Sequence, residues 1–459
     1  MENLKVQNFY KFTKNNINIL LDIPTSTVHV IDDVTSDVID CLEQNSAISE
    51  NQLSKKLNYY TSEEVKSAYN ELLGLYQQGH IFNDEKPSEL PRPNKDIVKA
   101  MCLHVAHDCN MRCKYCFASS GNFGGKSELM DIKTAKKAID FLVEKSNPRK
   151  NCEVDFFGGE PLLNMGMLEE LVNYIKEQEV IHDKNIRMTL TTNGLALNEM
   201  AQEFLNKNDI ATVLSLDGRE NVNNNMRKTD KGQETYSTIV ENYKAFLQKR
   251  KHQNYYLRGT FTKENLDFCE DVKHIVDLGF KEVSMEPVVE ERQTSYTITN
   301  RDLNKIKDEY WNLTEYYLKK YEEDLPFNFF HFNINLEGGP CSAKRVSGCG
   351  AGVEYVAVSP NGDLYPCHQF VGDESFKVGD VYNKEIDSSI ADTFFNTTMF
   401  SKDACRTCWS RYFCGGGCHA NAHQINGNIN KPYNLACELQ KVRTECSLYI
   451  EAIKALKTK

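Results

Sequence analysis

The sequence predicts an α/β protein whose central part is a partial (β/α)6 barrel, with a small domain before it and a cysteine-rich region after it. Strand-like and helix-like segments alternate six times between residues 100 and 290, while the first 83 residues show a separate pattern of strands followed by helices. From 338 to 437 this periodicity is lost, and cysteine and glycine become frequent. Six β–α repeats imply a parallel sheet with right-handed crossovers, and they are fewer than the eight that close a full barrel.

The composition is that of a globular protein and argues against several classes of function. The chain has 459 residues, of which 40% are hydrophobic and 26% charged, as in an ordinary globular protein of several domains. The net charge of −11 argues against broad nucleic-acid binding. The N-terminus lacks the features of a secretory signal, and no apolar run approaches the ~20 residues that span a bilayer. We therefore expect a cytoplasmic protein without a nucleic-acid or membrane partner.

We expect five segments along the chain. They are a small unit at 1–83, a proline-rich linker at 84–97, the barrel at 98–300, a connecting helix at 301–337 and a cysteine-rich domain at 338–459. The small unit contains two β runs, NINILLDI and TVHVI, and then three helices. In the last of these helices Thr61 and Glu64 form a capping box before an apolar stripe that includes Val65 and Leu72.

The barrel strands are short apolar runs separated by amphipathic helices. They are predicted at 101–105, 152–157, 186–192, 212–216, 255–261 and 282–289. In such folds, side chains at the C-terminal ends of parallel strands carry the chemistry.

Three cysteines follow the first of these strands. Cys109, Cys113 and Cys116 are spaced CxxxCxxC, so one loop can wrap a metal cluster. Cytosolic cysteines are kept reduced, which favours ligation over disulfides for the 16 cysteines of this chain. Three thiolates on a [4Fe–4S] cluster leave one iron without a protein ligand, and an open metal position can bind a substrate or cofactor.

This motif resembles that of the radical S-adenosylmethionine (SAM) superfamily, CxxxCxΦC, with Tyr115 as the aromatic residue Φ. The resemblance implies that SAM chelates the free iron. FFGGEP, TTNG and SLDG end the second, third and fourth predicted strands, and each alone is an ordinary turn. The resemblance assigns SAM contacts to Tyr115, Gly158, Gly159, Glu160, Pro161, Thr192, Asn193, Ser215, Arg227 and Glu286, and catalytic roles to Cys109, Cys113, Cys116 and Asp217.

The C-terminal cysteines form a second set, similar to the SPASM domain of radical SAM enzymes that modify peptides. The resemblance implies two auxiliary [4Fe–4S] clusters, one on Cys405, Cys408, Cys414 and Cys437, the other on Cys349, Cys367 and Cys418. Either Cys341 or a substrate thiolate completes the second one, and the sequence leaves both possibilities open. Zinc knuckles are the alternative for this region. His419 and His423 are interpreted as neighbours of the ligands or surface residues.

The N-terminal unit looks like the winged-helix-like recognition element of enzymes that modify ribosomally made peptides. Such elements bind a leader peptide as an added strand. The alternatives for this unit are dimerisation and DNA binding.

The order of domains resembles the maturases of six-cysteine peptides, in particular the thioether-forming enzyme of the clostridial SCIFF class. The stretch at 349–373 carries much of that closer resemblance. It implies SAM and three [4Fe–4S] clusters, a precursor peptide, and an external electron donor such as a flavodoxin or ferredoxin. A 5′-deoxyadenosyl radical would take a hydrogen from a threonine, to whose carbon a cysteine sulfur then bonds. An anaerobic sulfatase-maturase activity that forms formylglycine, and a zinc-stapled adaptor without activity, are the alternatives.

Overall fold

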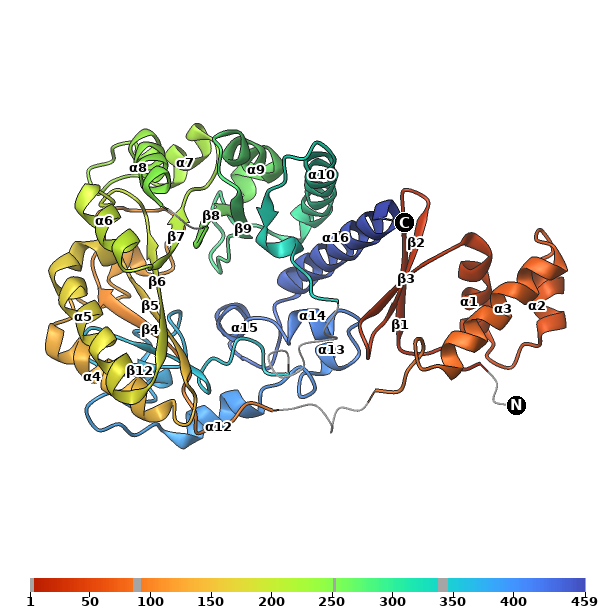
Figure 1. The fold of residues 1–459 in the computed structure, drawn as a ribbon, viewed down its shortest axis with the longest axis horizontal. Helices are drawn as coiled ribbons and strands as arrows, with labels where there is room; N and C mark the ends of the chain where they lie inside the picture. Colours follow the sequence, from red (N-terminus) through yellow and green to blue (C-terminus); the bar gives the residue numbers. More distant parts are fainter. Residues whose placement is uncertain (1–3, 86–91, 251–252, 337–345, 459) are drawn as a thin grey trace.

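Three regions follow one another across the molecule in Figure 1. The computed structural model describes residues 4–85, 92–250, 253–336 and 346–458. A small sheet with three helices lies at one end, and a curved sheet covered by helices lies at the other (Figure 1). Helices of the C-terminal region lie between them, so this region contacts both.

The N-terminal unit contains three antiparallel strands in the order β1-β2-β3. Its elements are β1 (Phe9–Lys14), β2 (Ile17–Asp22), β3 (Thr27–Ile31), α1 (Asp33–Gln44), α2 (Glu50–Lys56) and α3 (Ser62–Gln77). The prediction of two strands was wrong because β1, FYKFTK, is only half-buried and its aromatic residues pack against distant parts of the chain. The capping box of Thr61 and Glu64 at the start of α3 is confirmed.

The N-terminal unit is attached to the C-terminal region through aromatic and charged side chains. The ring of Tyr10 on β1 stacks on Trp409 with their centroids 3.8 Å apart, and the Tyr10 hydroxyl donates to Glu445. Glu85 accepts hydrogen bonds from Arg411 Nε at 2.8 Å and from the Tyr412 hydroxyl at 2.6 Å. These contacts hold the small sheet next to the cysteine-rich part of the chain.

A second sheet of ten strands forms the barrel, in the order β10-β9-β8-β7-β6-β5-β4-β11-β12-β13. The six predicted strands are confirmed as β4 (Ala100–Ala106), β5 (Asn151–Gly158), β6 (Asn185–Thr192), β7 (Ala211–Ser215), β8 (Tyr255–Phe261) and β9 (Glu282–Pro287). They pair in parallel and in chain order. Their C-terminal ends therefore lie along one edge of the sheet, as expected.

Short strands that the sequence did not predict extend this sheet. They are β10 (Asn328–Phe329), β11 (Tyr355–Val358), β12 (Asp363–Tyr365) and β13 (Gly379–Asp380). With two to four residues each, they are too short to show a periodic pattern. Strand β11 pairs in parallel with β4, so the cysteine-rich region continues the barrel sheet next to the strand that leads to Cys109.

Helices cover the outside of the curved sheet and fill the space between it and the small sheet (Figure 1). The outer layer contains α4 (Ile132–Lys145), α5 (Met165–His182), α6 (Glu199–Lys207), α7 (Glu220–Met226), α8 (Tyr236–Lys249) and α9 (Phe268–Asp277). The others are α10 (Leu303–Glu322), α12 (Ser388–Asn396), α13 (Asp403–Arg406), α14 (Arg411–Cys414), α15 (His419–Asn426) and α16 (Asn434–Thr458). Among the described residues, no helix combines the length and the apolar character that crossing a membrane requires.

Candidate functional site

The three cysteines of the CxxxCxxC motif lie on the loop after β4 and face one cavity of about 990 Å³. Two backbone hydrogen bonds fix this loop, from Arg112 to the Lys228 carbonyl at 2.8 Å and from Lys114 to the Met226 carbonyl at 3.0 Å. Burial raises the pKa of the Cys113 thiol to about 11. Metal ligation must remove such thiol protons, so binding of a cluster here would release them.

The two glycines of FFGGEP let β5 approach the cysteine loop. Gly158 has a φ of +129°, and a Cβ on it would lie 2.1 Å from the Ala106 carbonyl oxygen. A Cβ on Gly159 would lie 2.1 Å from the carbonyl oxygen of Asp108, the residue before Cys109. The backbone N–H groups of Gly159 and Glu160 donate to these same two carbonyls, at 2.7 and 2.8 Å. The glycines therefore position the loop as well as line the cavity.

Replacing Gly159 with alanine is expected to displace the Cys109 loop, because the new methyl group overlaps backbone that cannot move aside. We expect the free energy of unfolding to fall by about 1–3 kcal/mol, and bound iron to fall with it. Gly166→Ala on α5 is the matched control, since a Cβ there meets no atom within 4 Å. Thermal unfolding followed by circular dichroism, with iron analysis, checks both variants. Equal melting temperatures and iron contents for the two would contradict the positioning role.

Glu160 lies behind the cavity wall, at the end of β5, and connects it by hydrogen bonds to neighbouring segments. Its buried carboxylate accepts from the Asn193 backbone N–H at 2.7 Å and from the Thr192 hydroxyl at 2.9 Å. Burial raises the pKa of Glu160 to about 7. Asn193 in turn donates to Asn110 at 2.8 Å and to the Cys109 sulfur at 3.6 Å. The carboxylate thus links the TTNG turn to the cysteine loop, while Thr192 and Asn193 line the cavity itself.

A second group joins the partly buried Tyr115 to the buried Asp217 and Arg227. The Tyr115 hydroxyl donates to Asp217 at 2.6 Å and accepts from Arg227 at 3.3 Å. Asp217 also accepts from the Thr260 backbone N–H at 3.0 Å, and burial raises its pKa. Arg227 lines the cavity, and its buried Nε and Nη2 have no hydrogen-bond partner in the described part of the chain. Two unpaired guanidinium donors fit an anionic ligand such as a carboxylate.

The remaining predicted SAM-binding residues divide into those that face the cavity and one that does not. Ser215 and Glu286 line the cavity, whereas Pro161 is buried at the start of a short turn after β5. Glu286 pairs with Arg443 of α16 at 3.2 Å and lies 3.2 Å from His331. Burial alone would raise the pKa of Glu286, but His331 and the positive charge of Arg443 lower it well below its usual value. The carboxylate therefore remains ionised and ties β9 to the C-terminal helix.

The C-terminal cysteines lie near one another within each of the two groups that the resemblance implies. Cys437 lies close enough to Cys405, Cys408 and Cys414 for their charges to affect its pKa. Cys367 lies similarly close to Cys349 and Cys418. Among the described residues, no three ligand-type side chains are near enough to hold a single metal ion. Each group consists of three or four cysteines, and thiolates are the ligands that hold iron–sulfur clusters. Cys341 lies outside the described residues.

Both groups of C-terminal cysteines reach the cavity that the first motif lines. Its walls include Cys109, Cys113 and Cys116 together with Cys349, Cys414, Cys418 and Cys437. The sequence predicted each of these groups of cysteines, but it did not predict that they line the same cavity. The arrangement places cysteines of all three groups around one shared cavity.

Four basic residues that were not predicted also line this cavity. They are Arg258, His331, His368 and Arg443. Arg258 could have been found, because it alternates with buried Leu257 and Gly259 on β8 and so must point to the opposite face. The histidines and Arg443 come from irregular segments and α16, which carry no such signal.

The two histidines beside Cys418 do not line the cavity. Burial lowers the pKa of His419 to about 4, and its ring contacts Phe394. His423 contacts the rings of Phe370 and Phe376. Both therefore have packing partners in the core of the cysteine-rich region.

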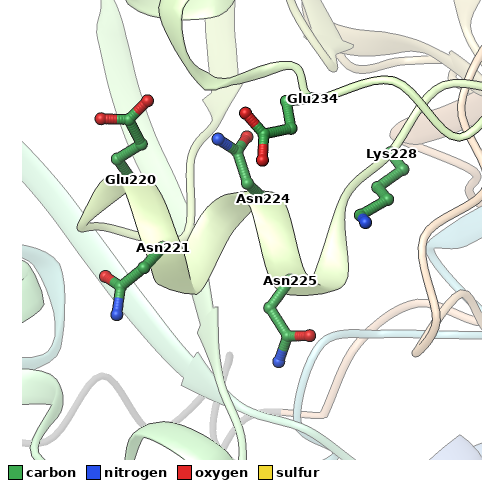
Figure 2. A pocket seen from close by; sticks show the side chains of 6 residues that line it. All are labelled: Glu220, Asn221, Asn224, Asn225, Lys228 and Glu234. Atoms are coloured by element: carbon green, nitrogen blue, oxygen red, sulfur yellow. The ribbon is translucent and has the colours of Figure 1, made fainter.

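A second hollow of about 620 Å³ lies over α7, apart from the cysteines. Figure 2 shows the six polar and charged side chains around it: Glu220, Asn221, Asn224, Asn225, Lys228 and Glu234. Asn224 uses its side-chain oxygen to accept from the backbone N–H groups of Thr235 and Tyr236. We interpret the hollow as part of the fold rather than as a catalytic site.

Two family models match the chain. One is described as a 4Fe-4S single cluster domain and matches residues 99–239; the other, SPASM, is described as an iron-sulfur cluster-binding domain and matches residues 349–409. An uncharacterized protein of Methanocaldococcus jannaschii is 31% identical over 218 residues, which cover 46% of this chain and 72% of that protein. The radical SAM cyclopropyl synthase TigE of Paramaledivibacter caminithermalis is 22% identical over 454 residues, covering 90% and 88%.

Solved structures share the fold. The structure of anSMEcpe with bound AdoMet and the Kp18Cys peptide has a TM-score of 0.64 at 20% identity, covering 78% of this chain and 99% of that chain. SuiB of Streptococcus suis bound to precursor peptide SuiA has a TM-score of 0.52 at 15% identity, covering 93% and 97%. The second likeness extends over nearly all of both chains.

Proposed function

The chain belongs to the radical SAM/SPASM family, and from this premise we propose that it joins a cysteine sulfur to a carbon of another residue, threonine by resemblance, in a ribosomally made precursor peptide. The observation that carries the proposal is the shared cavity. Cys109, Cys113 and Cys116 line one side of it, and the exposed Cys349 and Cys418 line another. A substrate thiolate and a substrate carbon can therefore occupy the same enclosed space.

The residues present fit the expected groups. Cys109, Cys113 and Cys116 would hold a [4Fe–4S] cluster, and the two unpaired donors of Arg227 would bind the carboxylate of SAM. When bound, the reduced cluster and SAM would supply the radical chemistry that breaks a carbon–hydrogen bond of the substrate. The protein contributes orientation: the hydrogen bond from the Tyr115 hydroxyl to the buried Asp217 fixes the cysteine loop, to which Tyr115 belongs, against the end of β7. Orientation of reacting groups can contribute roughly 7–11 kcal/mol to lowering a barrier.

The peptide substrate is supported by the structural relatives. Both anSMEcpe and SuiB have been solved with peptides bound. In this chain β3 pairs only with β2 among the described residues, so one edge of the small sheet is open. We propose that a leader peptide adds a strand at this edge, with main-chain hydrogen bonds giving affinity. The attachment of β1 to Trp409 would keep that leader close to the cysteine-rich region.

Iron and sulfide analysis tests the cofactor content of the proposal. Anaerobically purified protein is expected to contain about 12 irons and 12 sulfides per chain, because three [4Fe–4S] clusters contain four of each. About four of each would mean that the C-terminal cysteines hold something else. Iron near zero with stoichiometric zinc would overturn the assignment as an enzyme of this kind.

Product analysis tests the reaction itself. The reduced enzyme is incubated with SAM and a cysteine-containing precursor peptide, and the product is treated with iodoacetamide before mass spectrometry. A thioether requires the loss of two hydrogens and a cysteine that no longer reacts with iodoacetamide. Formylglycine would instead remove the sulfur, and a cyclopropane would remove two hydrogens while leaving the thiol reactive. The same peptide without its leader is the control and is expected to react much more slowly.

A further inference from the structure

Lys402 is a lysine with almost no exposed surface in the middle of the cysteine-rich region. It precedes α13 and is 1% exposed. Its Nζ donates to the carbonyl oxygen of Gly416 at 2.8 Å, and Gly416 lies between Cys414 and Cys418 in the chain. One carbonyl satisfies only one of the three donors of an ammonium group. The lysine therefore lacks the solvation that a charged side chain normally keeps.

In the described part of the chain, no carboxylate compensates the charge of Lys402. Lys402 forms no ion pair with an aspartate or glutamate within the described ranges, although an isolated buried ammonium is strongly unfavourable. The nearby groups that can be negative are thiols. Cys405, Cys414, Cys418 and Cys437 are all close enough to interact with it electrostatically.

These four cysteines are divided between the two C-terminal groups. Cys405, Cys414 and Cys437 are in one, and Cys418 is in the other. Lys402 therefore lies where its charge acts on two sites at once. Charges interact more strongly in a buried region than in water. The charge of Lys402 should therefore affect the neighbouring sites more than the charge of a surface lysine would.

We propose that Lys402 supplies a shared positive charge that raises the reduction potentials of both auxiliary clusters. The inference rests on the proposed function, since it requires both cysteine groups to hold clusters. Accepting one electron from an external one-electron reductant adds one negative charge to a cluster. A fixed cation nearby stabilises that added charge, and local charge is among the factors that set cluster potentials. Lys402 itself touches neither substrate nor SAM and acts through the clusters.

Lys441 provides a matched control. It also lies near Cys408 and Cys437, but its side chain is 35% exposed and pairs with Glu438 at 2.8 Å. Water and the paired carboxylate screen its charge. Removing the charge of Lys441 should therefore change the potentials much less than removing that of Lys402.

The test compares Lys402→Met, Lys402→Arg and Lys441→Met with the wild-type protein by redox titration monitored by electron paramagnetic resonance, with iron analysis of every sample. We expect Lys402→Met to lower both auxiliary midpoint potentials by at least about 59 mV, a tenfold change in a one-electron equilibrium. Lys402→Arg keeps the positive charge, so its auxiliary potentials should stay close to those of the wild-type protein. Lys441→Met should leave the potentials nearly unchanged.

Each other outcome is decisive. If Lys402→Met binds all its iron and neither potential moves, or only one moves, the shared role is overturned. If Lys402→Met loses auxiliary iron and Lys402→Arg retains it, the charge is needed to assemble the clusters rather than to set their potentials, which overturns the inference. If both variants lose that iron, Lys402 serves packing alone and the inference fails. A wild-type protein with only about four irons would instead refute the proposed function on which the inference rests.

Discussion

Replacing Cys113 with alanine is expected to abolish SAM cleavage, reducing 5′-deoxyadenosine to the level seen without enzyme. Cys113 is the middle ligand of the CxxxCxxC loop and lies near both Arg227 and Asp217, whose charges affect its pKa. Two remaining thiolates cannot hold the cluster that three are needed to hold, so about four irons per chain should be lost as well. Chromatography of the nucleoside product, together with iron analysis, measures both effects.

Cys269→Ala on α9 is the control for this prediction. Cys269 is 1% exposed, lies in the same barrel and is far in sequence from any ligand motif. A lone buried cysteine behaves as a small hydrophobe, so its loss should leave iron and SAM cleavage unchanged. SAM cleavage by Cys113→Ala at the rate of Cys269→Ala would show that the loop does not hold the reactive cluster.

Much of this site could be predicted because its information is local in sequence. Three cysteines within eight residues must lie close together in space. Glycine-containing turns at the ends of parallel strands must likewise lie at one edge of the sheet. The six barrel strands were found because β–α alternation repeats a signal that is weak in any one segment. The grouping of the C-terminal cysteines came from a resemblance to a whole domain. The structure brings cysteines of each group near one another, and the ligand sets stay a prediction.

What could not be predicted depends on contacts between distant segments. Strand β1 carries Tyr10, whose partner Trp409 is nearly 400 residues away, and β11 is recognisable only next to β4. Arg443 enters the site from the C-terminal helix, and nothing in its neighbouring residues marks it. Lys402 is the clearest case, because lysine is normally exposed and only the folded structure shows it buried among thiols.

The effect of removing an auxiliary ligand should differ in kind from that of removing Cys113. In Cys408→Ala we expect SAM cleavage to continue and thioether formation to be lost. Cys408 belongs to the group with Cys405, Cys414 and Cys437, and it does not line the cavity, so its loss leaves the walls around the first motif in place. About four irons per chain should be lost while the cluster on the first motif remains.

The measurement is the ratio of crosslinked peptide to 5′-deoxyadenosine under the same reducing conditions. In the wild-type protein the two should rise together, whereas in Cys408→Ala the nucleoside should accumulate without product. Cys446→Ala, at a buried position in the same helix as Cys437, controls for general damage to this region. Continued thioether formation in Cys408→Ala would mean that the reaction does not need this group of cysteines. Loss of both activities would mean instead that the cysteine-rich region mainly supports the barrel, as its shared sheet with β4 would allow.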